Sequence, residues 1–280
     1  MDGVPSRGDS VASLALPLPP GRMPLLRGGR QLKRWRYVGV YGPELMLCAG
    51  RVRVGLLRQT FWAVAEPGRP VRELASLRGG SVRLDGSRAV IEGDGVHVDV
   101  LVDEGGGVES VNPHGGGRGY VWTRKQAGVP ARGSAVVDGR EYEIDGLAVV
   151  DDTAGYHARH TTWTWCAGVG RGSGGERLGW NLVTGVNDGP VASERSVWVD
   201  GEPAEVGPVR IAADLSRVDF AEGGALEFAE WPGSARADDT DLLVLKSSYR
   251  QPFGSFAGRL PGGIPLAEGY GVMESHSAVW

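Results

Sequence analysis

The stretch SVRLDGSRAVIEGDGVHVDVLV, residues 81–102, contains three short apolar runs separated by two glycine-bearing turns. Asp85-Gly86 divides the first run from the second and suits a type I′ hairpin turn, in which both central residues take positive φ. In the third run, residues 96–102, valine occupies every even position through Val100. This period of two indicates strands with one buried face.

The same signals recur along the chain. Asp138-Gly139 and Asp200-Gly201 each follow a run suited to a strand, and 46 glycines without a period of three indicate many tight turns. The best helical candidates are short, at Val71–Leu77 and Arg236–Leu243. We therefore predict an all-β fold of roughly fifteen or more short strands, arranged as two tandem antiparallel barrels or sandwiches.

The length of 280 residues suits one large or two small β domains. Residues 1–29 are rich in Pro, Gly, Ser and Arg and are expected to form an extended leader lying across a barrel surface. We expect an N-terminal barrel over residues 30–150 and a C-terminal barrel over residues 151–280, with the boundary near residues 149–153.

Composition excludes several functions. The net charge is −4, so there is no basic excess for general nucleic-acid binding. Cys48 and Cys166 are the only cysteines and cannot form a disulfide framework, which favours a reduced cytoplasmic location. No stretch approaches the roughly 18 apolar residues of a membrane helix, and the oligomeric state is left open.

The run from Tyr156 to Trp198 is the richest in aromatic and polar candidates. If a strand begins near His157, Trp163 and Trp165 share its face, whereas His160 lies on the opposite face. The two histidines then cannot chelate together, so no metal site is expected. Each histidine is either a packed strand residue or an acid/base group beside a cavity.

Further along, Asn181 lies among apolar residues and needs hydrogen-bond partners in the wall or on a ligand. Glu194 and Trp198 share a strand face; facing an interior, this carboxyl would have a raised pKa and could act as an acid, but at the surface it would form an inert ion pair. Glu274 and His276 also share a face and could form an acid/base pair.

Several segments resemble the DUF2804 family of bacterial proteins, over about residues 28–280. They are the segment 28–37 (GGRQLKRWRY), 160–165 (HTTWTW), 179–182 (GWNL), Glu194 with 198–201 (WVDG), 251–254 (QPFG) and 271–276 (GVMESH). More remotely, the chain is similar to calycin-like proteins such as carotenoid 1,2-hydratase and tocopherol cyclase. This resemblance implies two tandem lipocalin-like barrels and a hydrophobic small-molecule ligand.

The expected function is binding of a hydrophobic small molecule in a Trp-lined barrel cavity, with a cofactor-independent hydration, cyclisation or isomerisation. No phosphate-binding loop or G-x-S-x-G elbow is present. The alternatives are a non-catalytic lipid or metabolite carrier and a structural module with filled barrels. The candidate catalytic residues are His157, His160, Glu194, Glu274 and His276, and the candidate ligand-binding residues are Tyr156, Trp163, Trp165, Asn181 and Trp198.

Overall fold

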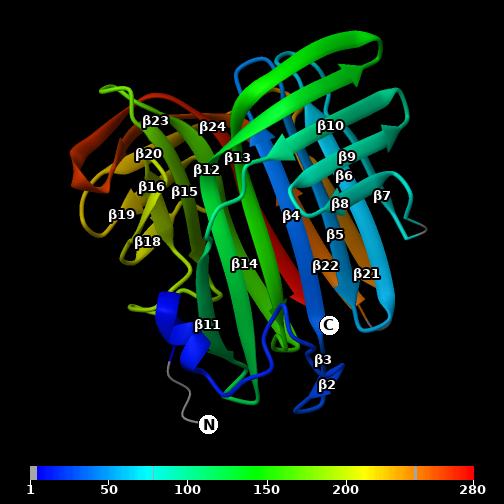
Figure 1. Ribbon diagram of the computed structural model, residues 1–280, viewed down its shortest axis with the longest axis vertical. Coiled ribbons are helices and arrows are strands. Elements are labelled where there is room, and N and C mark those ends of the chain that lie inside the picture. Colours follow the sequence, from blue (N-terminus) through cyan, green and yellow to red (C-terminus); the bar gives the residue numbers. More distant parts are fainter. Residues whose placement is uncertain (1–4, 78, 243–244) are drawn as a thin grey trace.

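The computed structural model describes residues 5–77, 79–242 and 245–280. Within them the chain forms two large curled antiparallel sheets and one two-stranded ribbon (Figure 1). This confirms the all-β prediction. Both helical candidates were wrong: the first forms strand β7 (Arg72–Ser76) and the second forms β21 (Arg236–Leu242), its residue 243 lying outside the described residues.

The first sheet has the strand order β7-β6-β5-β4-β13-β12-β10-β9-β8, and β11 pairs with both β12 and β1. Its strands other than β7 are β1 (Ser6–Arg7), β4 (Lys33–Tyr41), β5 (Met46–Val54), β6 (Leu57–Ala65), β8 (Val82–Asp85), β9 (Arg88–Gly93), β10 (Val96–Val102), β11 (Val108–His114), β12 (Gly119–Val137) and β13 (Arg140–Gly155).

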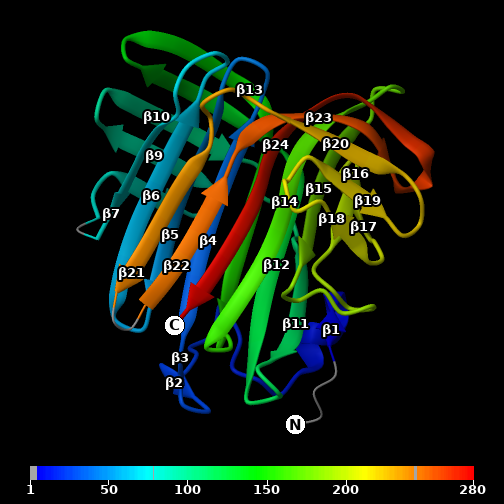
Figure 2. The same cartoon turned by 180° about the vertical axis from the view of Figure 1, so that it is seen from behind.

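The second sheet repeats this plan with the order β17-β16-β15-β14-β24-β23-β20-β19-β18, and β22 joins β24 to β21 (Figure 2). The change of sheet falls between the end of β13 and the start of β14. Its strands other than β21 are β14 (His160–Gly172), β15 (Arg177–Thr184), β16 (Ser196–Val199), β17 (Glu202–Glu205), β18 (Val209–Ile211), β19 (Arg217–Phe220), β20 (Ala225–Glu230), β22 (Leu245–Gln251), β23 (Phe253–Leu260) and β24 (Ile264–Val279).

The alternation in residues 96–102 has the predicted consequence. Val98 and Val100 are fully buried, whereas Leu101 between the two flanking valines is exposed. The buried valines pack with Trp62 and Ile91 in a core enclosed by the curl of the first sheet. A corresponding core, with Trp180 and Phe256, lies within the curl of the second sheet.

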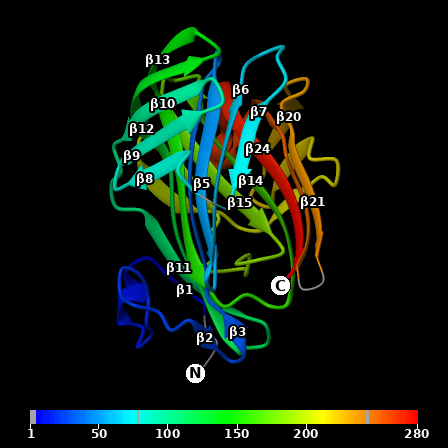
Figure 3. The same ribbon diagram turned by 90° about the vertical axis from the view of Figure 1, so that its right-hand side faces the viewer.

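Successive strand residues point to opposite faces of a sheet. One face of each sheet therefore packs on the core within its own curl, and the other face is turned toward the other sheet. Figure 3 shows β5 and β6 on one side and β24 and β21 on the other. A third apolar cluster joins the sheets, with Tyr37 and Cys48 from the first sheet packed among Trp165 and Phe253 from the second. The space between the sheets is therefore the place where side chains from both halves meet.

Close backbone approach fixes this arrangement at one point. Gly179 in β15 lies against the backbone of Ala127 and Gly128 in β12, so a Cβ at residue 179 would collide with it. Gly128 has a φ of +72° and follows Ala127, where the register of β12 with β13 shifts. Glycine is needed at residue 128 because the bulge takes a left-handed conformation, and at residue 179 because the backbone of the first sheet leaves no room for a Cβ.

The N-terminal segment packs on one end of the first sheet. It contains a 3₁₀ helix, η1 (Gly8–Ser13), and the ribbon of β2 (Leu26–Arg27) and β3 (Arg30–Gln31). Val11 and Met23 are buried in a cluster with Trp122. A second short 3₁₀ helix, η2 (Pro261–Gly263), precedes β24. Within the described residues, no helix has the length and apolar character needed to traverse a membrane.

Candidate functional site between the two sheets

A buried charged triad links the sheets. Lys125 of β12 places its Nζ 2.6 Å from Oδ1 of Asp151 in β13 and 3.4 Å from Oε1 of Glu194, which precedes β16. Burial opposes the charge on Lys125, but the two carboxylates outweigh it and raise the pKa of the ammonium. Burial raises the pKa of Glu194, although Lys125 acts in the opposite direction. Two carboxylates thus share one cation. Removal of any one of the three charges would leave a buried charge without its partner and would strongly destabilise the fold.

Glu194 is also held from within the second sheet. Asn187 Nδ2 donates to its Oε2 at 2.9 Å, and Asn181 Nδ2 donates to its backbone carbonyl at 3.0 Å. The Trp165 indole donates to Asn181 Oδ1 at 2.8 Å. The partners of Asn181 therefore lie in the wall itself, and Trp165 and Trp198 are buried in the cluster between the sheets.

The second acidic group, Glu274 of β24, lies on the side of the second sheet that faces the first. Its Oε1 accepts a hydrogen bond of 2.8 Å from Trp163 Nε1, and its Oε2 accepts one of 2.8 Å from Gln251 Nε2. Burial raises the pKa of Glu274 to about 7, against the opposing effects of the Trp163 hydrogen bond and the charge of Arg236. A carboxyl with this pKa is divided between its acid and base forms at neutral pH, as general acid–base chemistry requires.

Arg236 of β21 holds this group in place. Its Nη1 donates to Gln251 Oε1 at 3.3 Å and to the Tyr249 hydroxyl at 3.1 Å, and its Nε donates to Glu73 of the first sheet at 3.0 Å. Because the Gln251 carbonyl accepts from Arg236, its amide N–H points to Glu274. The guanidinium also lies 4.5 Å from the centroid of the Phe61 ring.

Two indoles meet across the sheets beside the carboxyl groups. The rings of Trp35 in β4 and Trp163 in β14 are parallel within 8°, with centroids 6.5 Å apart, and both side chains are partly exposed. Trp35 Nε1 donates to Asp151 at 3.4 Å, just as Trp163 donates to Glu274. The two indoles therefore connect the charged triad to Glu274. We call the triad, the two indoles and Glu274 together the intersheet site.

The histidines of this region are held neutral. Burial and the nearby His114 and Lys33 lower the pKa of His157 far below its usual range, and its ring lies 5.1 Å from that of Trp35. Burial lowers the pKa of His276 to about 4. The His276 ring packs 4.2 Å from Trp163, and its Nε2 lies 2.8 Å from the Ser247 hydroxyl.

The structure gathers most of the candidates predicted from the sequence. Those at or beside the intersheet site are His157, Trp163, Trp165, Asn181, Glu194, Trp198, Glu274 and His276. His160 is exposed, on the opposite face of β14 from Trp163. Tyr156 is buried under the N-terminal segment, where its hydroxyl donates to the Pro24 carbonyl at 2.7 Å.

Glu274 and His276 share a face as predicted, but they do not bond to each other. The Glu274 carboxyl accepts from Trp163, and the His276 ring packs against the same indole and bonds to Ser247. The sequence reasoning missed Trp35, Lys125, Asp151, Arg236 and Gln251. The sequence signal that could have identified Lys125 and Asp151 is a charged residue within or directly after a run of buried strand residues.

Comparisons with known proteins agree with this architecture. A family model described as a domain of unknown function, DUF2804, matches residues 71–280. No curated protein matches the chain. A crystal structure of a Nitrosomonas europaea protein assigned as AttH superposes with a TM-score of 0.51 at 14% identity, covering 94% of this chain and 99% of that one. The likeness to this protein shows a common fold over nearly the full length.

Two other solved structures are less similar. Kievitone hydratase from Nectria haematococca has a TM-score of 0.49 at 10% identity, with 87% of this chain and 88% of that chain covered. CghA in complex with Sch210972 has a TM-score of 0.42 at 10% identity, with 95% of each chain covered.

Proposed function

The chain belongs to the DUF2804 family, as its motifs predicted, and we propose that it binds a flat, apolar, unsaturated small molecule at the intersheet site and transforms it by acid–base chemistry without a cofactor. The observation that carries this proposal is the position of Glu274. A buried carboxyl with a pKa of about 7 is hydrogen-bonded to one of two parallel, partly exposed indoles.

The chemistry follows from these groups. Protonated Glu274 donates its proton to a carbon–carbon double bond, and positive charge develops on the neighbouring carbon. The faces of Trp163 and Trp35 stabilise that charge by cation–π interaction. The resulting carboxylate then takes back a proton, either from the adjacent carbon to complete an isomerisation or from water or a hydroxyl group that has added to the cation.

The surrounding residues prepare the carboxyl for this cycle. Trp163 and Gln251 donate to both oxygens, so they stabilise the carboxylate that forms after proton donation. Burial favours the acid form before donation. Because His276 and His157 are held neutral, no cationic imidazole competes with the developing charge.

The test measures proton transfer directly. A panel of apolar alkenes and polyenes is incubated with the protein in D₂O, and deuterium uptake is followed by mass spectrometry. We expect uptake into at least one compound with the wild-type protein and none with Glu274→Gln. As a matched control, Glu73→Gln removes a carboxyl that contacts Arg236 but not the indoles, and uptake is expected to persist.

The alternatives give different results. A carrier would retain an apolar compound through purification equally well in wild-type and Glu274→Gln protein, without deuterium uptake in either. A structural module would retain none. Either outcome would contradict the proposed acid–base function.

A further inference from the structure

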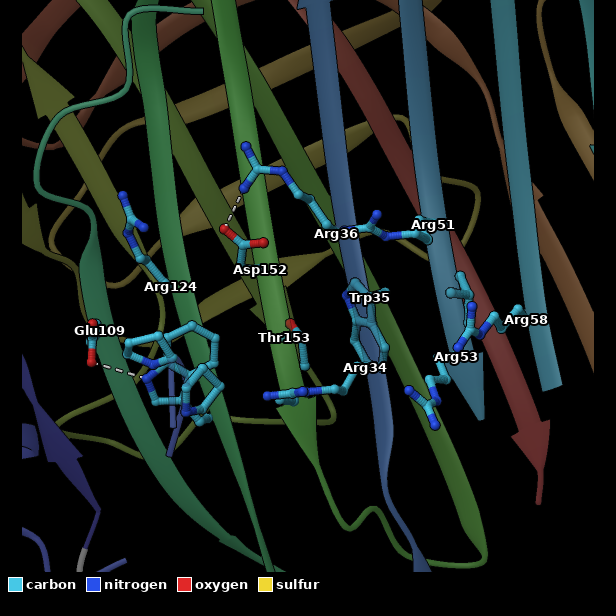
Figure 4. Close-up of a pocket in the computed structure, with 15 residues that line it drawn as sticks. Arg34, Trp35, Arg36, Arg51, Arg53, Arg58, Glu109, Arg124, Asp152 and Thr153 are labelled. Atoms are coloured by element: carbon cyan, nitrogen blue, oxygen red, sulfur yellow. Dashed lines mark hydrogen bonds and ion pairs between the residues drawn. The ribbon is translucent and has the colours of Figure 1, made fainter. Parts of the chain in front are cut away.

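We propose that the opposite face of the first sheet carries a second site, which binds the phosphate group of a small phosphorylated molecule. A groove of about 600 Å³ lies there, between the central strands and Pro19-Pro20 of the N-terminal segment. Figure 4 shows the arginines that gather along it, from β4, β5, β6 and β12. They are Arg34, Arg36, Arg51, Arg53, Arg58 and Arg124.

The strand register places these arginines directly opposite one another. Arg53 of β5 pairs with Arg34 of β4 on one side and with Arg58 of β6 on the other. These three residues form one row across three adjacent strands, which lie about 4.8 Å apart. Like charges in directly opposed positions destabilise a sheet, so this row is costly in the absence of a bound anion.

A second row lies one step further along the strands and is only partly neutralised. Arg36 faces Arg51 on β5 and Asp152 on β13. It forms an ion pair of 2.7 Å with Asp152 and a further ion pair with Glu104. The acidic groups of the groove thus lie from β13 to β11, where Asp152 and Glu109 line it, whereas the β4–β6 end is basic.

Carboxylates do not compensate the basic end. Among the side chains that the structure describes, those of residues 5–77, 79–239 and 247–280, no carboxylate forms an ion pair with Arg34, Arg51 or Arg58. Arg53 donates from Nε to the Gly55 carbonyl at 2.9 Å, which leaves its terminal nitrogens for other acceptors. The protein as a whole has a net charge of −4, so this concentration of positive charge is a local feature.

The shape and lining of the groove indicate the ligand class. Guanidinium groups bind phosphate oxygens through paired, planar hydrogen bonds, and the row of Arg58, Arg53 and Arg34 offers several to one anionic head. Along the same row follow Ala154 and then Trp122, whose indole donates to the Glu109 carboxylate at 3.0 Å, so the groove changes from basic to mixed apolar and acidic beyond the arginines. The volume is typical of small-ligand sites. We infer a ligand with one or two phosphate groups on the arginine row and a less polar body toward Ala154.

The first experiment titrates inorganic pyrophosphate into the full chain at low ionic strength by calorimetry. We expect one molecule to bind per chain. Arg34→Gln and Arg53→Gln should each weaken binding by roughly tenfold or more. Arg132→Gln is the control, because Arg132 is exposed and forms an ion pair of 3.5 Å with Asp145 on another part of the sheet. The affinity of this variant for pyrophosphate should equal that of the wild type.

Thermal unfolding of the same proteins separates a binding role from a structural one. Without pyrophosphate, Arg34→Gln should unfold at the same or a higher temperature than the wild type, because a repulsive pair is removed. Added pyrophosphate should raise the midpoint of the wild type and of Arg132→Gln but not that of Arg34→Gln. A lower midpoint for Arg34→Gln without ligand would overturn the inference, because it would show that the arginine is structural.

Sedimentation with vesicles identifies the source of the phosphate. If the ligand is a free molecule, vesicles of phosphatidylcholine with phosphatidic acid will not sediment the protein; if it is a lipid headgroup, they will, and Arg34→Gln will abolish this. Both results support the phosphate site. The inference is overturned if the protein binds neither pyrophosphate nor these vesicles, or if wild type, Arg34→Gln and Arg53→Gln bind equally. It is also overturned if the protein binds single-stranded oligonucleotides that pyrophosphate fails to displace. The deuterium-uptake test with Glu274→Gln concerns the intersheet site, so its result does not depend on any of these phosphate-binding experiments.

Discussion

Trp163 Nε1 donates a hydrogen bond of 2.8 Å to Oε1 of Glu274. This contact links an aromatic surface to an acid whose pKa burial raises to about 7. The indole and the carboxyl belong to adjacent strands of the second sheet, and the Trp35 ring of the first sheet stacks on the same indole. A molecule that stacks on this pair would therefore lie beside the acid.

Replacing Trp163 by Phe should raise the pKa of Glu274 further. The indole hydrogen bond favours the carboxylate, and its loss leaves an accepting oxygen without that donor. We also expect a loss of about 1–3 kcal/mol in the free energy of unfolding, measured with urea. Trp198→Phe is the control, since it removes an indole from the same intersheet cluster without touching Glu274. An unchanged pKa in Trp163→Phe would contradict the role given to this bond.

The stability of the protein should fall with rising pH because of Glu274. Its folded-state pKa of about 7 lies above the unfolded value of about 4.3. The folded state therefore retains a proton that the unfolded state loses, so the stabilisation is complete below about pH 4 and is lost as pH rises through about 7. The total is about 3–4 kcal/mol, since one pKa unit corresponds to about 1.4 kcal/mol.

Glu274→Gln isolates this effect from other titrating groups. The free energy of unfolding of wild type minus that of the variant should decrease by about 3–4 kcal/mol between about pH 4 and pH 8. Urea unfolding across this range provides the measurement. Parallel pH profiles for the two proteins would show that Glu274 titrates normally in the folded state.

Lys125→Met should strongly destabilise the protein. The change leaves Asp151 and Glu194 buried without their shared cation, and removal of one partner from a buried ion pair costs about 3–5 kcal/mol. Adding Asp151→Asn and Glu194→Gln to the variant should restore much of the loss. Arg132→Met serves as the control and should cost less than about 1 kcal/mol, since that pair is exposed. A similar effect of both single changes would exclude a special role for the triad.

His157 and His276 should remain neutral across the physiological range. Burial lowers the pKa of His276 to about 4 and that of His157 far below its usual value. In proton NMR spectra assigned with His157→Gln and His276→Gln variants, their ring signals should not shift between about pH 5.5 and 8. Titration of either ring with a midpoint near 6.5 would place it in a solvated environment instead.

The local signals of the sequence predicted much of the fold. Hairpin turns and alternation in residues 81–102 identified β8, β9 and β10, because both signals depend only on neighbouring residues. Period two also assigned Trp163 and Trp165 to one face of β14 and His160 to the other. The segment 71–77 was mistaken for a helix because its strand, β7, is defined by pairing with β6 at the sheet edge.

The composition of the intersheet site could not be read from the sequence. Trp35 and Trp163 are brought together by the packing of two sheets, and Arg236 reaches Glu73 across the same interface. Such contacts depend on which face of each strand is turned toward the partner sheet, and alternation leaves both choices open. The arginine row was hidden for a related reason, since its charges are adjacent only through the register of three strands.

The most direct test of the central claim is the titration of Glu274 itself. Carbon-13 NMR of protein labelled at the glutamate carboxyl carbon, with Glu274→Gln to assign the signal, reports its protonation without any substrate. We predict a midpoint at about pH 7. A midpoint near the ordinary value of about 4.3 would mean that the carboxyl is ionised at neutral pH, and it would contradict the assignment of Glu274 as the proton donor.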